Sequence, residues 1–464
     1  MVLGCTSDAG KSFLAAALCR WFTRRGESVA PFKAQNMSNN AAVCPDGGEI
    51  GRAQWLQAKA SRIQPDIRMN PILLKPEADT RSQVVVLGRY DPEITRTPWL
   101  ERRTILWPTV TSSIDSLSRD FDRIIAEGAG SPAEPNLMRY DLVNIAVARY
   151  LGAACYLVAD IDRGGAFAHL LGTYETLDPE DRGLIRGFVL NKFRGDPALL
   201  LNARQWLEDL TDVPTVALVP FRRSILPEED SFFHRAKGGK GLIRIALVLY
   251  PHASNLDEFD PLAYEDGIDL VPVYKTEDIE GAAAIILPGS KSTTASLAYL
   301  RNSGLADRIA RAAREGVPIY GVCGGLQMLG KDILDPNAIE GANAKGFGLL
   351  DITTEFSPEK TVGLRSVECE DGSRVCGYEI HHGLSHAQSG AHPYLAEGLG
   401  WRSGNVTGVY LHGIFENTDY RQRFLSSLGW RGQTMDWNAR IDSNLDTIAD
   451  MVDESGWRYD LEGL

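Results

Sequence analysis

The sequence lacks three features that would point to specialised classes of protein. Its seven cysteines are odd in number and scattered, with no C-x-x-C pair, so neither a disulfide framework nor a structural zinc site is predicted. It has no apolar run of the roughly 20 residues needed to cross a bilayer. It also has no basic excess, and a net charge of -13 disfavours general binding to nucleic-acid phosphates. We therefore expect neither a membrane nor a nucleic-acid partner.

What remains is the composition of a soluble globular protein, with 44% hydrophobic and 23% charged residues. A length of 464 residues predicts about two or three domains. A glycine-rich loop containing Asp8 and Lys11 occupies the stretch where a signal peptide would need an apolar core, which predicts a cytoplasmic protein. Only Met1-Val2-Leu3 precedes that loop as a first strand, which favours a natural start upstream.

The chain divides into two series of buried strands that alternate with amphipathic helices. The first series includes strands expected at 123–126, 154–159 and 187–190 and a helix at Lys11–Arg24. A second series begins with a strand at 243–250. The predicted class is α/β, with a doubly wound parallel sheet of the P-loop NTPase kind in the first domain. We place this domain at 1–225, a linker at 226–241 and a second domain at 242–464.

A glycine-rich loop between the first strand and the first helix predicts a nucleotide site. Backbone N–H groups there can cradle the phosphates of ATP, Lys11 would neutralise the β- and γ-phosphates, and Ser12 would ligate Mg²⁺. The loop has one residue more between its glycines than the common P-loop and resembles that of dethiobiotin synthetase. A tight turn without nucleotide is the alternative. The expected ATP-binding residues of this loop are Gly4, Thr6, Ser7, Asp8, Ala9, Gly10, Lys11 and Ser12.

Polar residues follow three later strands of the first domain, at the edge where open α/β sheets bind ligands. Glu127 and Asp160 are candidates, together with Ser12, for holding Mg²⁺ directly or through water. Asn191 is a candidate for reading a purine edge. The alternatives are helix N-caps for the two acids and a polar turn for the asparagine.

A dense row of amides and cations in the first domain predicts a surface for an anionic, amide-rich substrate. Such groups cost free energy when buried unless they face water or a polar ligand. Ordinary surface-loop chemistry is the alternative for any one of them. The candidates are Lys33, Gln35, Asn36, Asn39, Lys75 and Arg81.

The second domain contains a cysteine in the frame Gly-x-Cys-Gly-Gly, between an apolar strand and a helix. This pattern predicts a nucleophile elbow, in which small neighbours permit a strained turn and the helix N-terminus favours the reactive thiolate of Cys323. The backbone N–H groups of Gly289, Ser290 and Gly324 are candidates for stabilising an oxyanion. A buried structural cysteine is the alternative.

Of the eight histidines, His412 is the best candidate for the base, because it ends an apolar strand. The position two residues later, where triad glutaminases usually carry an acid, is Ile414. Either Glu416 reaches back as a third member or the site works as a Cys–His dyad. The second domain is thus expected to be a flavodoxin-like class I glutaminase that supplies ammonia.

Together these motifs resemble the cobyric acid synthase family over nearly the whole chain. Its most specific parts here are 33–37, 69–88, 159–165 and 191–196. The resemblance implies ATP- and glutamine-dependent amidation of the b, d, e and g carboxylates of a corrinoid, adenosylcobyrinic acid a,c-diamide, to give adenosylcobyric acid in cobalamin biosynthesis. A carboxyl group would be activated as an acyl phosphate in the first domain and meet ammonia released at Cys323.

Three alternatives stay open at this point. Cobyrinic acid a,c-diamide synthase is a relative with the same two domains and a different corrinoid substrate. A biotin-type carboxylating ligase would use the phosphate loop but leave Cys323 without a role. A partition-type regulatory ATPase with an inactive glutaminase module predicts no glutamine hydrolysis at all.

Overall fold

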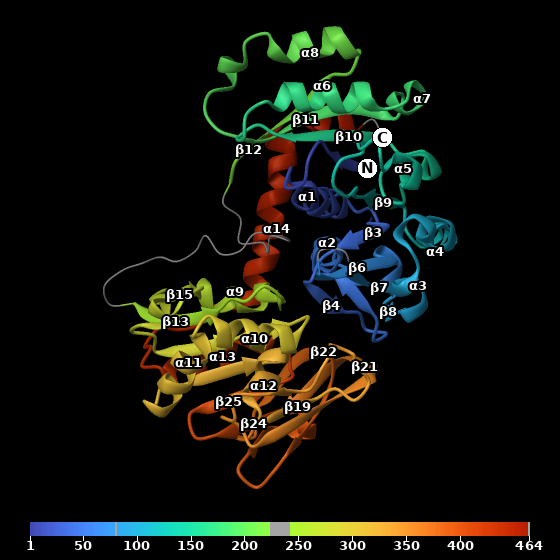
Figure 1. Ribbon diagram of the computed structural model, residues 1–464. Coiled ribbons are helices and arrows are strands. Elements are labelled where there is room, and N and C mark those ends of the chain that lie inside the picture. Colours follow the sequence, from blue (N-terminus) through green and yellow to red (C-terminus); the bar gives the residue numbers. More distant parts are fainter. Residues whose placement is uncertain (79–80, 223–241, 463–464) are drawn as a thin grey trace.

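The computed structural model of the protein describes residues 1–78, 81–222 and 242–462 (Figure 1). The linker expected at 226–241 lies outside the described residues, as does the side chain of Arg81. The described chain forms two α/β bodies, one above the other in Figure 1, each built on its own parallel sheet.

The upper body is built on a parallel sheet that follows from the buried aliphatic strands of the first half. Strands β1, β10, β11 and β12 pair in that order, and β2 pairs with β9. A parallel bridge from Val2 to Glu127 joins the two groups into one layer. The six strands are β1 (Val2–Gly4), β2 (Val29–Phe32), β9 (Arg123–Ala126), β10 (Cys155–Asp160), β11 (Ile185–Phe193) and β12 (Thr215–Pro220).

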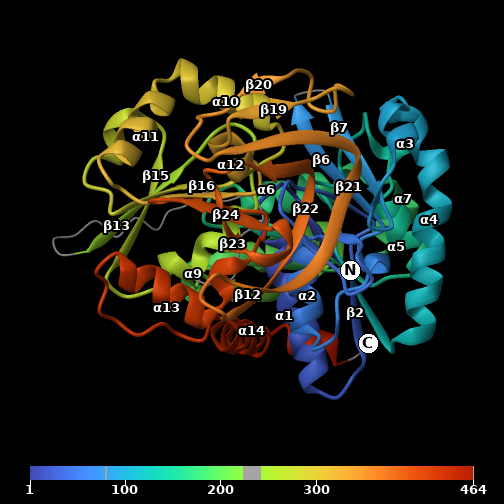
Figure 2. The ribbon, with the colours of Figure 1, turned by 90° about the horizontal axis from the view of Figure 1, so that it is seen from below.

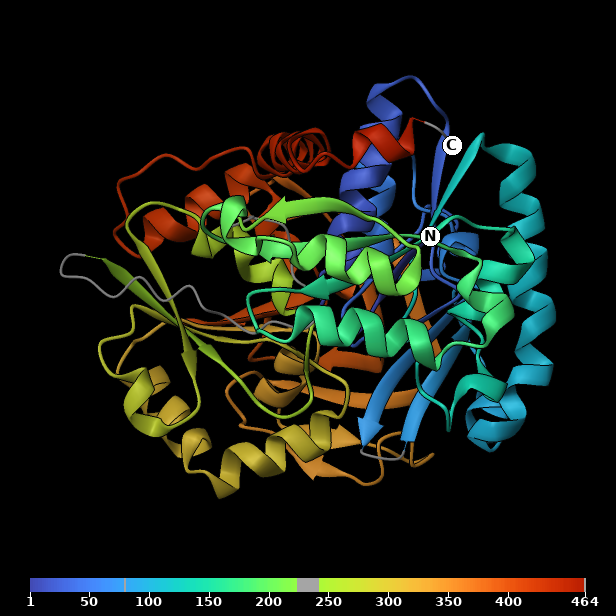
Figure 3. The ribbon, with the colours of Figure 1, turned by 90° about the horizontal axis from the view of Figure 1, so that it is seen from above.

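Helices cover both faces of this sheet, because alternate side chains of each buried strand point to opposite faces. Val158 packs with α1, whereas its neighbour Leu157 packs with α5, α6 and α8. Figure 3 shows the green helices α6 and α8 lying over the sheet. The doubly wound sheet is confirmed. The helices are α1 (Lys11–Arg24), α2 (Arg52–Ala60), α3 (Pro92–Arg96), α4 (Trp99–Asp120), α5 (Ile145–Leu151), α6 (Ala166–Thr176), α7 (Pro179–Arg182) and α8 (Ala203–Thr211).

A smaller sheet hangs below the first one and carries the amide row. It has the order β3-β6-β7-β8, and a two-stranded hairpin of β4 and β5 lies beside it. Its position brings residues 35–51 toward the second body (Figure 1). The strands are β3 (Gln35–Met37), β4 (Ala41–Val43), β5 (Glu49–Gly51), β6 (Ile72–Ala78), β7 (Arg81–Val86) and β8 (Arg89–Tyr90).

The lower body has a sheet of the order β15-β13-β16-β18-β25-β24-β23, of which the first five strands are parallel. Its strands are β13 (Ile243–Val248), β15 (Ile268–Val273), β16 (Ala284–Leu287), β18 (Ile319–Val322), β23 (His392–Leu395), β24 (Gly400–Ser403) and β25 (Val406–Val409). Its helices are α9 (Asp260–Ala263), α10 (Thr293–Asn302), α11 (Leu305–Arg314), α12 (Gly324–Leu329) and α13 (Thr418–Ser427). The short strands β14 (Ala253–Ser254) and β17 (Gly289–Ser290) pair at the edge that faces the upper body.

A second sheet of the lower body supplies part of the contact between the two bodies. Its strands are β19 (Asp332–Leu334), β20 (Ala344–Lys345), β21 (Ile352–Glu368) and β22 (Arg374–Ala387). Tyr378 and Ile380 of β22 share one buried cluster with Leu73 of β6 and Val85 of β7. Seen from below, the long orange hairpin of β21 and β22 lies beside the blue strands β6 and β7 (Figure 2). Apolar burial therefore helps to hold the two bodies together.

The C-terminal helices do not pack with the domain to which we assigned them. Helix α14 (Trp437–Glu454) runs beside α1, and α14 and α15 (Arg458–Leu461) bury their apolar faces in the core under β10, β11 and β12 (Figure 1). Ion pairs from Arg20 and Arg24 to acids of α14 border this contact. The segment expected at 242–464 is thus one unit in sequence but divides between the two bodies in space.

Candidate active sites

Cys323 sits on a strained turn between β18 and α12. Its φ of 50° and ψ of -106° are values that L-residues rarely adopt, as the nucleophile elbow requires. Glycines make the turn possible, because a Cβ on Gly325 would lie 2.1 Å from the carbonyl oxygen of Leu287. The Cys323 side chain is 6% exposed. The predicted elbow is therefore present.

His412 follows β25 and is held by a carboxylate that we did not predict. Its Nδ1 lies 2.8 Å from Oε1 of Glu258, and the other oxygen of Glu258 accepts from the N–H of Gly413 at 2.8 Å. Burial alone would lower the pKa of His412, but Glu258 and a hydrogen bond with Cys323 raise it to about 10. The three side chains form a buried Cys–His–Glu relay with the geometry of a triad.

Glu416 does not reach His412 in the structure, and His412 is not without a carboxylate as a Cys–His dyad would predict. The residues after His412 form a 3-10 turn, η7 (Ile414–Glu416), which carries the Glu416 carboxylate to Arg52 of α2 at 2.6 Å. Glu258 instead comes from η4 (Leu256–Phe259), about 150 residues earlier in the chain. The only available sequence signal was the acidic pair Asp257-Glu258 beyond the first strand of the second series.

Ser290 and Gly324 lie together beside the nucleophile. A Cβ on Gly324 would come within 2.8 Å of the backbone nitrogen of Ser290. Lys291 donates its N–H to the carbonyl oxygen of His252, the residue before β14, so the N–H of Ser290, one residue earlier, points the opposite way, toward the elbow. A Cβ on Gly289 would instead lie 3.1 Å from His412 and from Ser254. Ser290 and Gly324 are thus the better placed of the three oxyanion candidates.

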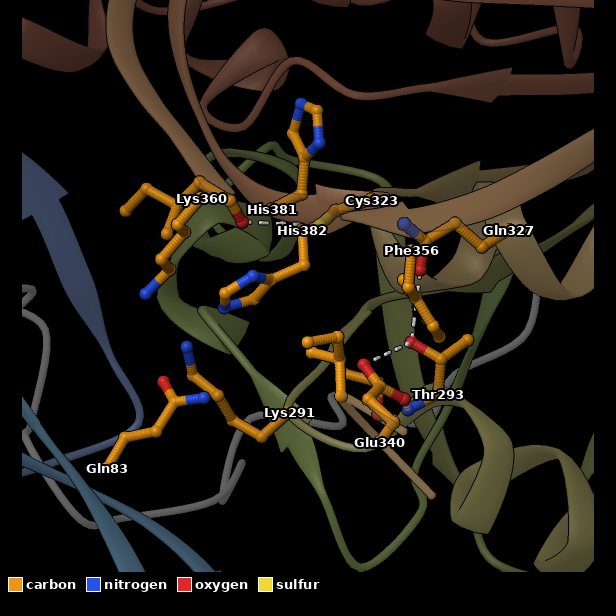
Figure 4. A pocket seen from close by; sticks show the side chains of 13 residues that line it. Gln83, Lys291, Thr293, Cys323, Gln327, Glu340, Phe356, Lys360, His381 and His382 are labelled. Carbon is orange, nitrogen blue, oxygen red and sulfur yellow. Dashed lines mark hydrogen bonds between the residues drawn. The ribbon is translucent and has the colours of Figure 1, made fainter. Parts of the chain in front are cut away.

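A cavity opens beside Cys323 and is lined by side chains from both bodies (Figure 4). Gln83 comes from β7 of the upper body, whereas Lys291 and Lys360 come from the lower one. Across the cavity Glu340 accepts hydrogen bonds from the backbone N–H groups of Thr293 and Thr294 at the start of α10. The cavity therefore carries opposite charges on two of its walls.

The glycine-rich loop of the upper body has the expected strand–loop–helix form. Nζ of Lys11 donates to the carbonyl oxygens of Thr6 and Gly130, each at 3.1 Å. Ser12 donates from Oγ to Glu127 at 2.6 Å. Asp8 and Gly10 have positive φ, so the loop curves back over the start of α1. Backbone N–H groups at this helix start suit bound phosphates.

Glu127 is the centre of a buried polar cluster at the end of β9. It accepts hydrogen bonds from Lys33 at 3.0 Å and from Gln57 at 2.7 Å, in addition to Ser12. Burial would raise the pKa of Glu127, but Lys33 and these hydrogen bonds hold it below its ordinary value. The carboxylate is therefore ionised next to the phosphate loop.

Comparison with known proteins assigns the chain to a family. Residues 1–231 match the model of the CobQ/CobB/MinD/ParA nucleotide binding domain, and residues 244–420 match that of the CobB/CobQ-like glutamine amidotransferase domain. A curated cobyric acid synthase of Deinococcus radiodurans is 51% identical, covering 99% of this chain and 99% of its own. The chain belongs to the cobyric acid synthase family. A second member, from Variovorax paradoxus, is 48% identical over 100% of this chain and 98% of its own.

Membership of the cobyric acid synthase family confirms the resemblance drawn from the motifs. It makes the chain a ligase with a nucleotide-binding domain and a glutamine amidotransferase domain. The α/β class of both domains is confirmed too. Within the part of the chain that the structure describes, no helix is both long and apolar enough to cross a bilayer.

Asp160 and Asn191, two further residues expected at the nucleotide site, form contacts with other residues of the protein. Asp160 lies 3.0 Å from Nζ of Lys192 and 3.5 Å from Nε of Arg163. Asn191 donates from its amide to the carbonyl oxygen of Ala9 at 2.8 Å and so supports the phosphate loop. The expected contact of Asn191 with the nucleobase therefore stays a prediction for this cobyric acid synthase family member.

The residues expected to contact substrate differ in burial: some are buried in contacts within the protein, and others are partly exposed. Lys33 belongs to the Glu127 cluster, and Lys75 is fully buried against Glu49, so neither offers a free cation to a substrate. Asn36 is also buried, with its amide donating to Gln54 at 3.1 Å.

Gln35 and Asn39 are only partly buried and stay candidates. Oδ1 of Asn39 has no hydrogen-bond partner among the described residues although that atom is buried. An unsatisfied buried oxygen of this kind suits a donor on a ligand.

The Glu258→Gln variant is expected to lower kcat for glutamine hydrolysis by about 10²-fold. The reason is that an amide cannot hold the protonated imidazole of His412 as the carboxylate does. Glu416→Gln is the matched control and should retain more of the activity. The measurement is glutamate release with purified variants. Equal losses in the two variants would contradict the assignment of Glu258.

Proposed function

We propose that the chain amidates the b, d, e and g carboxylates of adenosylcobyrinic acid a,c-diamide with ATP, Mg²⁺ and glutamine, forming adenosylcobyric acid. The observation that carries the proposal is a buried Cys–His–Glu relay and a phosphate loop within one chain that aligns end to end with curated cobyric acid synthases. Each amide would consume one glutamine and one ATP and release glutamate, ADP and phosphate.

The glutaminase half-reaction follows from the relay around Cys323. The sulfur attacks the side-chain amide carbon of glutamine, and the N–H groups of Ser290 and Gly324 stabilise the oxyanion. His412 donates a proton to the departing ammonia, and water then releases glutamate from the thioester. Glu258 keeps the imidazole oriented and stabilises its positive charge.

The synthetase half-reaction uses the phosphate loop. Lys11 and the backbone N–H groups of the loop hold the phosphates of ATP in line with a substrate carboxylate, which takes the γ-phosphoryl group. Ammonia then displaces phosphate from the acyl phosphate, giving the amide. The protein's contribution is positioning and charge stabilisation, since no covalent group of its own is needed.

The oxygen atoms at the loop fit a magnesium ion. Mg²⁺ prefers hard oxygen ligands and takes one or two carboxylates together with phosphate oxygens and water. Ser12 and Glu127 present a hydroxyl and an ionised carboxylate side by side. Asp160 is the last residue of β10, which is separated from β9 by β1 in the sheet. Mg²⁺ held by Ser12 and Glu127, with Asp160 through water, would neutralise charge on the phosphates.

Glu340 is the proposed partner of the α-ammonium group of glutamine, and Lys291 is that of the α-carboxylate, because Lys360 is already paired with Glu49. Burial raises the pKa of Glu340 to about 7, against the effect of the Thr294 and Thr293 N–H groups. The ionised form, which binds an ammonium group, therefore dominates only above that pH. The cavity walls thus suit a zwitterionic amino acid whose side chain reaches Cys323.

The Glu340→Gln variant is expected to raise the KM for glutamine about 10- to 100-fold, because a charge-assisted hydrogen bond is lost. In the wild type, kcat/KM for glutamine should fall as the pH drops below about 7, since protonation of Glu340 removes the same charge. Steady-state kinetics with glutamine and with free ammonia give both results. An unchanged KM in the variant would exclude Glu340 from the glutamine site.

The overall function is tested by product analysis with ATP, glutamine and adenosylcobyrinic acid a,c-diamide. The expected products are corrinoids with one to four added amides, ending at adenosylcobyric acid. Amidation of cobyrinic acid instead of its diamide would favour the a,c-diamide synthase alternative. Absence of any glutamine hydrolysis would favour the partition-type ATPase.

A further inference from the structure

Helix α2 touches the surroundings of both active sites. At its first residue, Nε of Arg52 lies 2.6 Å from Asp257, and Nη2 lies 2.6 Å from Glu416. Asp257 directly precedes Glu258 in η4, and Glu416 ends the turn that begins after His412. Arg52 of the synthetase domain therefore forms ion pairs with both segments of the glutaminase domain that position Glu258 and His412.

The same helix reaches the nucleotide site through its two glutamines. Gln57 donates to Glu127 at 2.7 Å and to the carbonyl oxygen of Ser12 at 3.3 Å. Gln54, one turn earlier, lies 3.5 Å from Glu127. Both glutamines are buried, and Gln57 is five positions after Arg52, which is about 7.5 Å along a helix axis. One short rigid element thus spans the distance between the two sites.

A second contact ties the start of α2 to the histidine. The carbonyl oxygen of Asn40 accepts from the N–H of Arg52 at 3.1 Å, while its side-chain oxygen accepts from the N–H of Asn255 at 2.9 Å. Asn255 in turn places its amide 3.4 Å from Nδ1 of His412. Asn40, α2, η4 and His412 therefore form a continuous set of polar contacts across the domain boundary.

These contacts are buried and so respond to small displacements. The side chains of Arg52 and Asp257 are 9% and 7% exposed, and an ion pair desolvated to this extent is strongly destabilised when one partner moves away. At the other end, Mg²⁺ and nucleotide at Ser12 and Glu127 would compete with Gln57 for the same carboxylate. A change in the partners of Glu127 would therefore act on the same helix that carries Arg52.

We propose that α2 couples the two half-reactions, with Arg52 as a positioning residue that holds Glu258 and His412 in the competent arrangement when the nucleotide site is loaded. This inference rests on the proposed function in assigning the two sites to ATP and glutamine. Coupling between sites is typically worth about 5- to 150-fold. Glutamine hydrolysis is thereby fastest when ATP is bound, which limits wasted ammonia.

The test measures glutamate release without corrinoid, with and without Mg²⁺ and a non-hydrolysable ATP analogue. We expect the analogue to raise wild-type glutamine hydrolysis about 10-fold. Arg52→Gln and Asp257→Asn should each abolish that response, and the double variant should be no worse than either single variant. Arg52→Lys should restore part of it. Lys59→Gln, which removes a cation from the far end of α2, is the matched control.

The pH profile separates positioning from general damage. When Glu258 is held less firmly, the pKa of His412 falls, so the alkaline limb of kcat for glutamine hydrolysis should move to lower pH in Arg52→Gln. Ammonia-dependent amidation should stay within about twofold of wild type, since that half-reaction does not use the relay. Loss of ammonia-dependent activity in Arg52→Gln would indicate misfolding. In that case Asp257→Asn, which breaks the same ion pair from the glutaminase domain, tests the coupling instead.

Two results would overturn the coupling role. One is a wild-type enzyme whose glutamine hydrolysis is indifferent to the ATP analogue. The other is an Arg52→Gln variant that responds as the wild type does. Failure of the proposed corrinoid amidation is a separate outcome, because it is read from products with ammonia or glutamine, whereas the coupling is read from glutamate alone.

Discussion

Replacement of Cys323 by serine is expected to abolish glutamine-driven amidation, by roughly 10⁴-fold or more, while free ammonia still supports it. The expectation follows from the elbow, because the strained turn presents the side chain of residue 323 to the glutamine amide, and the two residues after it are glycines. A serine hydroxyl beside His412 is a far weaker nucleophile than a thiolate. The phosphate loop lies in the other body and is unaffected, so acyl phosphate formation continues.

The measurement is corrinoid product formation with glutamine and, separately, with ammonium salt at a pH that supplies free ammonia. Cys376→Ser is the matched control, because that thiol is exposed and lies outside the cavity. It should leave both activities unchanged. If ammonia fails to rescue a folded Cys323→Ser variant, the division of labour between the two domains is wrong.

The sequence predicted the two sheets because their strands are short apolar runs between amphipathic helices. The helix expected at Lys11–Arg24 is found with those bounds as α1, and the strand expected at 123–126 is β9. Periodicity reports which face of a segment is buried but not what buries it. Helix α14 therefore read as part of the second domain, although its apolar face packs against α1 in the first.

The parts of the candidate site that could be predicted are those whose residues lie in one continuous sequence motif. Cys323 and Ser12 each stand in a strand–turn–helix frame whose geometry follows from local sequence. Glu258 could not be found in this way, because its meeting with His412 depends on how η4 folds over the end of the sheet. Only tertiary structure shows which of two nearby acids faces the imidazole.

The two lysines expected to meet substrate show a further limit of sequence reasoning. A cation in a polar stretch is usually exposed, yet Lys33 and Lys75 are each buried against a carboxylate, Glu127 and Glu49 respectively. Such pairs join distant parts of the chain, so no local pattern marks them. Glu49 also pairs with Lys360 of the lower body, which makes this charge cluster part of the domain contact.

The pairing of Lys33 with Glu127 makes Glu127→Gln the second variant with a large expected effect. Amidation with either nitrogen source should fall by roughly 10³-fold, because the carboxylate proposed to hold Mg²⁺ beside the phosphate loop is replaced by a neutral amide. The free energy of unfolding should also fall by about 3 kcal/mol, since the buried ion pair of Lys33 and Glu127 loses its carboxylate. Product analysis and denaturant unfolding measure the two effects separately.

A second substitution separates the catalytic loss from the loss of stability. Lys33→Met in the Glu127→Gln background removes the other member of the ion pair, and replacing both members of a buried pair is often neutral, so stability should return to within about 1 kcal/mol of wild type. Activity should not return, because the Glu127 carboxylate to which Ser12 donates is still absent. If the double variant recovers amidation together with stability, Glu127 is a structural partner of Lys33 and magnesium is held elsewhere.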